Sequence, residues 1–86
     1  METKIGVVSH YFTNIGVSVF ELTEGELHVG DTIHIKGNLT DLTQVVEEMQ
    51  IDHKEIDVAP KGTQVGVKMD DKVREGDSIY VVSLKE

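Results

Sequence analysis

The sequence EGDSIYV at residues 75–81 resembles the sequence VGDTIHI at residues 29–35, with the same Gly-Asp pair followed by Ser or Thr and then Ile. A looser copy, GTQVGV, stands at residues 62–67, where a glycine is again followed by alternating apolar residues. Glycine adopts a positive φ without a Cβ clash, and an Asp beside it can hydrogen-bond the local backbone. Each copy therefore predicts a sharp corner in the chain that is followed directly by a β-strand.

Alternation of apolar and polar residues, the pattern of half-buried strands, occupies much of the remaining chain. It is clear at residues 5–12 and 15–19, which the short connection Thr13-Asn14 joins into a predicted hairpin. Three corners in so small an antiparallel protein indicate strands that fold round on themselves, because closure removes exposed edges. The prediction is an all-β fold, a small closed antiparallel barrel of about six to seven strands that fills residues 1–86 as one domain.

The segment DLTQVVEEMQ at residues 41–50 permits two interpretations. Its apolar residues fall at the spacing of an amphipathic helix, and Asp41 with Gln44 can form a capping box. A strand requires Val46 to point inward and a change of parity before Met49, which a β-bulge provides. The local pattern alone favours the helix slightly.

Composition excludes several classes of chemistry. The 86 residues include no cysteine, so disulfides, thiol catalysis and thiolate metal sites are excluded. No phosphate-binding loop of the form GxxxxGK[ST] is present, and no apolar run approaches the roughly 20 residues of a membrane span. Because Met1-Glu2-Thr3-Lys4 leads straight into a predicted strand without the pattern of a signal peptide, we expect a cytoplasmic protein.

Catalytic and metal-binding residues are not expected either. The four histidines, at positions 10, 28, 34 and 53, show no close ligand spacing, and His34 alternates with apolar neighbours so that it is predicted to face solvent. The carboxylate pairs Glu47-Glu48 and Asp70-Asp71 are neighbours that point to opposite faces or lie in turns. Ser9-His10 lacks the acid and oxyanion donors of a triad. We therefore expect no enzyme activity, no cofactor and no metal.

The net charge of −8 disfavours binding to nucleic acid, because affinity for phosphates rests on Lys and Arg. Residues 1–53 hold nine acids and two bases, whereas residues 54–86 hold seven acids and six bases. If RNA is bound, the C-terminal half is the expected place, with Tyr80 or His53 available for stacking. The candidate contacts to RNA or to a partner are Gln50, His53, Lys54, Lys61, Lys68, Lys72 and Arg74.

Several phrases together resemble the second-domain β-barrel of translation GTPases such as elongation factor Tu. They are the strand at residues 15–19, LHVGDTI at 27–33, APKGTQVG at 59–66 and REGD at 74–77. The chain is also similar to stand-alone translation elongation factor-like proteins and to the C-terminal barrel of collagenase-like peptidase-related proteins, a group implicated in RNA modification. Those two groups of proteins contain strings similar to HYF at 10–12, KG at 36–37 and MQI at 49–51 of this chain. The resemblance covers nearly the whole chain and implies that residues 42–51 form a strand.

The resemblance also implies a function. In elongation factor Tu the corresponding barrel helps to hold the aminoacyl end of tRNA, partly through an acid on the strand that resembles residues 50–53. Gln50 replaces that acid here, and no GTPase domain is present, so elongation activity is not implied. The leading hypothesis is a non-catalytic adaptor for a protein or ribonucleoprotein of the translation or RNA-modification machinery. The alternatives are a direct RNA-binding protein and a detached accessory subunit of a collagenase-like enzyme.

Overall fold

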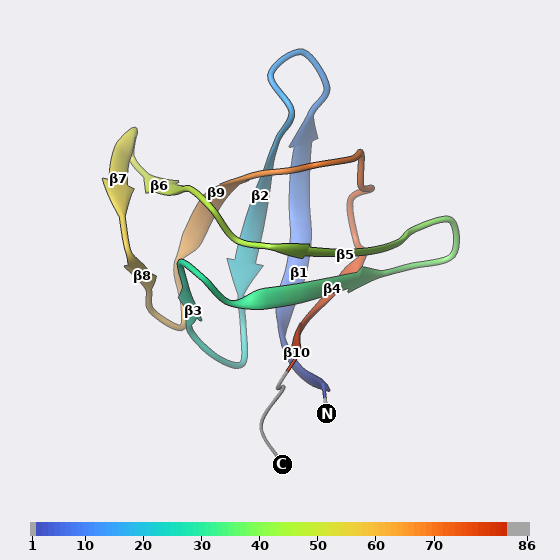
Figure 1. Cartoon of the computed structure of the whole chain (residues 1–86), viewed down its shortest axis with the longest axis horizontal. Coiled ribbons are helices and arrows are strands. Elements are labelled where there is room, and N and C mark those ends of the chain that lie inside the picture. The colour runs from blue at the N-terminus through green and yellow to red at the C-terminus, as the bar shows by residue number, and fades with distance from the viewer. Residues whose placement is uncertain (1, 83–86) are drawn as a thin grey trace.

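The computed structural model describes residues 2–82, which form ten β-strands and no helix (Figure 1). Within this range we therefore find no helical segment with the length and hydrophobicity needed to span a bilayer. The strands, in chain order, are β1 (Glu2–Phe12), β2 (Val17–Leu22), β3 (Leu27–His28), β4 (Thr32–Lys36), β5 (Asp41–Val45), β6 (Met49–Ile51), β7 (Lys54–Ile56), β8 (Val58–Ala59), β9 (Gln64–Lys68) and β10 (Ser78–Val82).

Eight strands form one antiparallel sheet, and the other two pair with each other. The order in the large sheet is β5-β4-β10-β1-β2-β9-β6-β7, while β3 pairs with β8. Strands β1 and β10 lie side by side from the start, with Glu2 opposite Val82. The β1–β2 and β4–β5 hairpins project from the body of the molecule in different directions (Figure 1).

The three predicted corners are confirmed. Gly30, Gly62 and Gly76 have φ values of 98°, 90° and 89°. Strands β4, β9 and β10 each begin two residues after one of these glycines. Only a residue without Cβ adopts this left-handed backbone at low cost, which is why glycine occupies each corner.

Asp31 and Asp77, which follow Gly30 and Gly76, stabilise the turns by hydrogen bonds to the backbone. The Asp31 amide donates to the His28 carbonyl over 3.1 Å, and the Asp31 carboxylate accepts from the His28 amide over 3.0 Å. Asp77 makes the same pair of bonds to Arg74, over 3.2 and 2.9 Å. The repeated phrase is therefore one turn used twice, in which the aspartate carboxylate satisfies a backbone donor that the turn leaves free.

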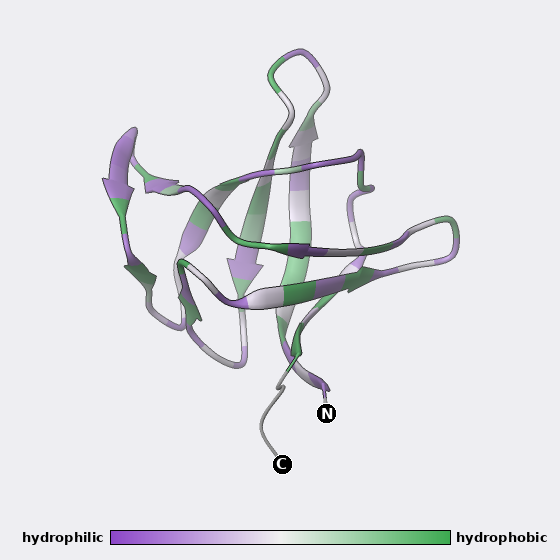
Figure 2. Cartoon of the chain, in the orientation of Figure 1, coloured by the Kyte–Doolittle hydropathy of each residue, from purple (hydrophilic) through white to green (hydrophobic). Residues whose placement is uncertain are grey.

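The core lies between the inward faces of the curved sheet, and alternation of hydropathy follows the strands (Figure 2). Phe20 and Leu22 of β2 and Ile33 and Ile35 of β4 are fully buried two positions apart, as the period of a strand requires. The remaining buried apolar residues are Ile5, Val8, Leu27, Val46, Met49, Ala59, Val65, Val67, Met69, Val73 and Ile79.

Residues 41–51 form strands β5 and β6, so the strand interpretation is confirmed and the helix is wrong. Gln44 and Val46 are buried at alternate positions, but Met49 is buried three residues after Val46. Glu47 and Glu48 are exposed between the two strands and supply the extra residue that changes the parity. The helical spacing of the apolar residues is thus a by-product of this irregularity.

The expected closed barrel of six to seven strands is wrong, because there are ten strands and no sheet closes. The large sheet ends at β5 on one side and at β7 on the other, since the chain leaves the β5 ladder at the irregular residues 46–48. The segment after β3 contacts residues next to both ends: Val29 N–H donates to the Asp57 carbonyl beside β7 over 2.9 Å, and Gly30 N–H donates to the Val46 carbonyl beside β5 over 2.8 Å. These bonds link the ends of the sheet without forming a continuous ladder.

The predicted β1–β2 hairpin is confirmed, but its loop is longer than Thr13-Asn14. Gly16 has a φ of 67°, and the amides of Ile15 and Gly16 both donate to the Phe12 carbonyl. Ile15 therefore lies in the loop rather than in a strand, and 67% of its surface is exposed.

Candidate functional site

Only some of the residues predicted to make contacts come together. Gln50 and His53 line one hollow, and Gln50 and Lys68 line a smaller one beside it. Arg74 lines a different hollow with Lys36, next to the loop of the β4–β5 hairpin. Lys54 lies in β7, Lys61 in the turn before β9 and Lys72 in the loop after it, and none of these three lines either hollow next to Gln50.

The hollow next to Gln50 and His53 has a volume of about 370 Å³, and we call it the outer groove. One wall comes from the β1–β2 hairpin and the other from the β6–β7 hairpin, with the outer face of β2 and β9 as the floor. Its lining residues are Phe12, Ile15, Val17, Val19, Gln50, Asp52, His53, Gln64 and Gly66. The apolar members share the groove with two side-chain amides.

Gly66 forms the floor of the outer groove. It lies in the middle of β9, with Val19 of β2 opposite on one side and Gln50 of β6 opposite on the other. Its φ is not in the left-handed region, and a Cβ at this position would meet its nearest atoms at 3.6 Å, an ordinary contact. Neither the backbone nor the packing therefore requires glycine, which costs about 0.5–1 kcal/mol relative to alanine inside a strand.

Asp52 and His53 form the tight turn of the β6–β7 hairpin at the edge of the outer groove. They are the two residues between the paired positions Ile51 and Lys54, and their φ values are 53° and 66°. Two consecutive left-handed residues define a type I′ turn, which is normally built from Asn-Gly. Asp is favoured at the first of these positions, whereas a residue other than glycine at the second, such as His53, costs of the order of 1 kcal/mol. Both side chains are nevertheless retained and exposed.

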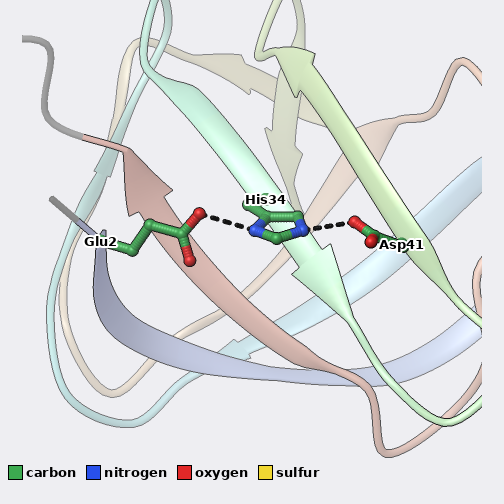
Figure 3. Close-up of polar contacts among 3 residues, drawn as sticks. All are labelled: Glu2, His34 and Asp41. Carbon is green, nitrogen blue, oxygen red and sulfur yellow. Dashed lines mark hydrogen bonds and ion pairs between the residues drawn. The ribbon is translucent and has the colours of Figure 1, made fainter.

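A second polar cluster is centred on His34, on the outer face of β4. Its Nδ1 lies 2.7 Å from Glu2 Oε2 and its Nε2 lies 2.5 Å from Asp41 Oδ1 (Figure 3). These contacts raise the pKa of His34 above 6.5, chiefly through the hydrogen bond to Asp41 and then that to Glu2, while burial opposes them. His34 lies on the outer face of β4, as its alternation with Ile33 and Ile35 predicts, but the side chain is only 14% exposed.

Among the residues that the structure describes, the other histidines make separate pairwise contacts. His10 lies 3.1 Å from Glu75 and its ring contacts that of Phe12, whereas His28 pairs with Glu26. Tyr80, the other expected stacking residue, lies near His34, with ring centroids 6.4 Å apart. Within residues 2–82, no three His, Asp or Glu side chains converge in a group able to hold a metal ion.

Comparison with known proteins gives clear relatives. A protease of Methanocaldococcus jannaschii that is described as uncharacterized is 42% identical over 80 residues, which are 92% of this chain and 19% of that protein. A collagenase of Porphyromonas gingivalis is 36% identical over 86 residues, which are 99% of this chain and 24% of the collagenase. The chain is homologous to a segment of these collagenase-like proteins. It spans about a fifth to a quarter of their length. No protein-family model matches the chain.

Solved structures agree on the fold. The C-terminal domain of a Geobacillus thermoleovorans protein assigned to the U32 peptidases superposes with a TM-score of 0.84 at 20% identity. The match covers 92% of this chain and 91% of that domain, so the two share an arrangement of strands. A selenomethionine variant of the same domain gives a TM-score of 0.83 at 21% identity, over 90% of this chain and 96% of that domain.

These relatives correct the functional hypothesis from sequence. The adaptor of the translation machinery is wrong, because the relatives are named proteases and collagenases. The expected similarity to the collagenase-like barrel is confirmed as homology, whereas the similarity to elongation factor Tu stays a prediction. Ile15, Asp52, Gln64 and Gly66 also line the outer groove but were not among the contact residues predicted from the sequence. A lone glycine inside the alternating strand at residues 64–68 was the available signal for Gly66.

Proposed function

We propose that this chain is a non-catalytic module of the collagenase-like proteins, which works together with a catalytic part made by other residues. The observation that carries the proposal is the identity of 36–42% over nearly the whole chain, which matches only 19–24% of the relatives' length. A protease and a collagenase act on polypeptides, so we extend that substrate class to the assembly in which this module works.

The geometry of the chain supports a binding role rather than a catalytic one. The best-organised polar group, His34 between Glu2 and Asp41, has carboxylates on both ring nitrogens. A histidine that serves as a general base needs one nitrogen free to take a proton from a nucleophile or water. His34 is engaged on both sides and therefore joins strands β1, β4 and β5 instead.

Direct binding to RNA has less support. Lys68 and Arg74 line separate hollows, and Lys54, Lys61 and Lys72 line neither. A binding site for a phosphate backbone needs several cations along one path. A cytoplasmic location and the absence of a cofactor stay predictions from the sequence.

The test is a replacement experiment in the Porphyromonas gingivalis collagenase. Its segment homologous to this chain is deleted, and this chain is then fused in its place or added as a separate polypeptide. We expect the deletion to lower kcat/KM for denatured collagen and this chain to restore a measurable part of the loss. A Phe20→Asp variant, which places a charge at a fully buried site, serves as the unfolded control.

The isolated chain is assayed on the same substrate. It should give no cleavage above the background of the buffer. Cleavage by the isolated chain, or a deletion that leaves kcat/KM unchanged, would contradict the proposed function.

A further inference from the structure

We propose that the outer groove binds an extended polypeptide segment of basic character, whose main chain passes over Gly66. This inference rests on the proposed function and names the kind of ligand that the module would take. It depends on two features of the groove that the fold does not require, on the chemistry of its lining and on its charge.

The first feature is Gly66 itself. A Cβ fits at this position and the φ is not in the left-handed region, so alanine would stabilise the strand relative to glycine. The missing side chain leaves a notch between Val19 and Gln50, which lie opposite Gly66 on the two neighbouring strands. Glycine inside a strand often marks a place where a ligand or another backbone approaches closely.

The second feature is the Asp52-His53 turn, which lies in a different hairpin. Asp52 is a common residue at the first position of a turn with both φ values positive, but the second position, where glycine is preferred, carries the exposed His53. Strain of this kind is retained when the side chains serve another purpose. Gly66 and His53 thus each lower the stability of the fold, and both line the outer groove.

The lining matches a peptide chain. Gln50 and Gln64 stand on β6 and β9 with side-chain amides that each donate and accept hydrogen bonds, as a peptide group does. Phe12 and Ile15, which are 43% and 67% exposed, form an apolar wall beside them. Because β9 is paired on both sides, the side-chain amides of Gln50 and Gln64 would bond the main chain of the segment, while the apolar wall contacts its side chains.

Charge complementarity selects a basic peptide. Asp52 lines the outer groove, Glu48 lines the smaller hollow that shares Gln50 and Gly66 with it, and Lys68 is the one cation in either lining. The whole chain carries a formal charge of −8, so its field attracts cations and repels phosphates. Lysine or arginine side chains of a bound segment would lie near the two carboxylates.

The experiment follows the amide NMR spectrum of the ¹⁵N-labelled chain during titration with a blocked peptide of alternating lysine and valine. A peptide of the same length with glutamate in place of lysine is the matched control, and a uridine oligonucleotide of equal length is the third probe. We expect the basic peptide alone to shift the amides of Ile15, Gln50, His53 and Gly66. The shifts should persist at near-physiological salt.

Three variants test the location of binding. Gly66→Val should weaken binding of the basic peptide at least about tenfold, since it fills the notch. Gly66→Ala keeps the assay informative if the valine variant does not fold, and it should weaken binding about threefold. Leu39→Ala is the control, because Leu39 is also exposed at a hairpin tip, at 75%, but lies outside the outer groove.

The inference is overturned if no probe binds, if the uridine oligonucleotide binds instead, or if shifts spread over the acidic surface and are indifferent to the Gly66 variants. These outcomes are separable from failure of the proposed function. If the groove inference alone is wrong, the Gly66→Val chain restores the truncated collagenase as well as the unchanged chain does. If the proposed function alone is wrong, peptide binding is measured but the collagenase is not restored.

Discussion

Asp41 Oδ1 lies 2.5 Å from His34 Nε2, so the first residue of β5 holds the outer face of β4. On the other side of the ring, Nδ1 contacts Glu2 of β1. A neutral imidazole has one N–H and can donate to only one of these carboxylates, whereas the imidazolium donates to both. His34 can therefore donate to both Glu2 and Asp41 only when it is protonated. Because the two carboxylates favour the protonated form, they raise the pKa of His34.

Stability is consequently predicted to fall as pH rises. Because the folded pKa of His34 lies above the value of 6.5 in the unfolded chain, the stabilisation is fully present below pH 6.5. It is lost as the pH rises through the raised folded value. Urea unfolding across this range should show a greater free energy of unfolding on the acidic side, and NMR titration of the His34 ring should give a pKa above 6.5.

The His34→Gln variant supplies the reference for this prediction. The difference in unfolding free energy between the unchanged chain and the variant should shrink with rising pH, while Asp41→Asn should leave a weaker pH dependence. A difference that stays constant or grows on the alkaline side would show that His34 is not held by the two carboxylates.

Gln44 is predicted to stabilise the open side of the sheet. Its Nε2 donates to the Lys68 carbonyl over 3.0 Å, and its Oε1 accepts from the Asp70 amide over 2.8 Å. Replacing Gln44 by Leu retains the volume but leaves two backbone groups without these partners. We expect a loss of about 2–3 kcal/mol, measured by urea unfolding. Thr43→Val, an exposed neighbour on β5, should change stability by less than about 0.5 kcal/mol, and equal losses at both sites would refute the bridging role.

The corner glycines allow a direct test of backbone strain. Replacing Gly76 by Ala puts a Cβ into open space, since no atom lies within 4 Å, but the φ of 89° remains unfavourable. We expect a loss of about 1–2 kcal/mol. Gly66→Ala is the matched control, because it also has room for Cβ but has no positive φ, and its stability should stay equal or rise. Thermal unfolding that ranks the two variants in the opposite order would refute this account.

The sequence predicts well those elements whose conformation is determined by residues adjacent in the chain. The corners at Gly30, Gly62 and Gly76 follow from residues that are adjacent in the chain, and the structure has them at the predicted positions. The strand at residues 42–51 needed the family resemblance, because the local spacing alone slightly favours a helix. The exposed pair Glu47-Glu48, which changes the parity, has no unique sequence signature.

The elements that the sequence does not predict depend on contacts between distant residues. Glu2 reaches His34 across 32 positions, and the sequence pattern of β4 alone indicates an exposed histidine. The open ends of the sheet depend on which strands pair, which alternation of hydropathy does not specify. Likewise, the outer groove is assembled from two hairpins and β9, so its members share no motif.

The β6–β7 turn gives a final prediction, in which stability and binding change in opposite directions. His53 has a φ of 66°, so His53→Gly should relieve strain and raise stability by about 0.5–1 kcal/mol, which corresponds to an increase in Tm of roughly 2–8 °C. Leu39→Gly is the control, because Leu39 lies in another hairpin turn without a positive φ and should lose stability. If His53 lines a binding site, the stabilised variant should also bind the basic peptide less tightly. A His53→Gly chain that is less stable than the unchanged chain would show that the side chain is retained for the fold, and the argument from strain to function at this turn would fail.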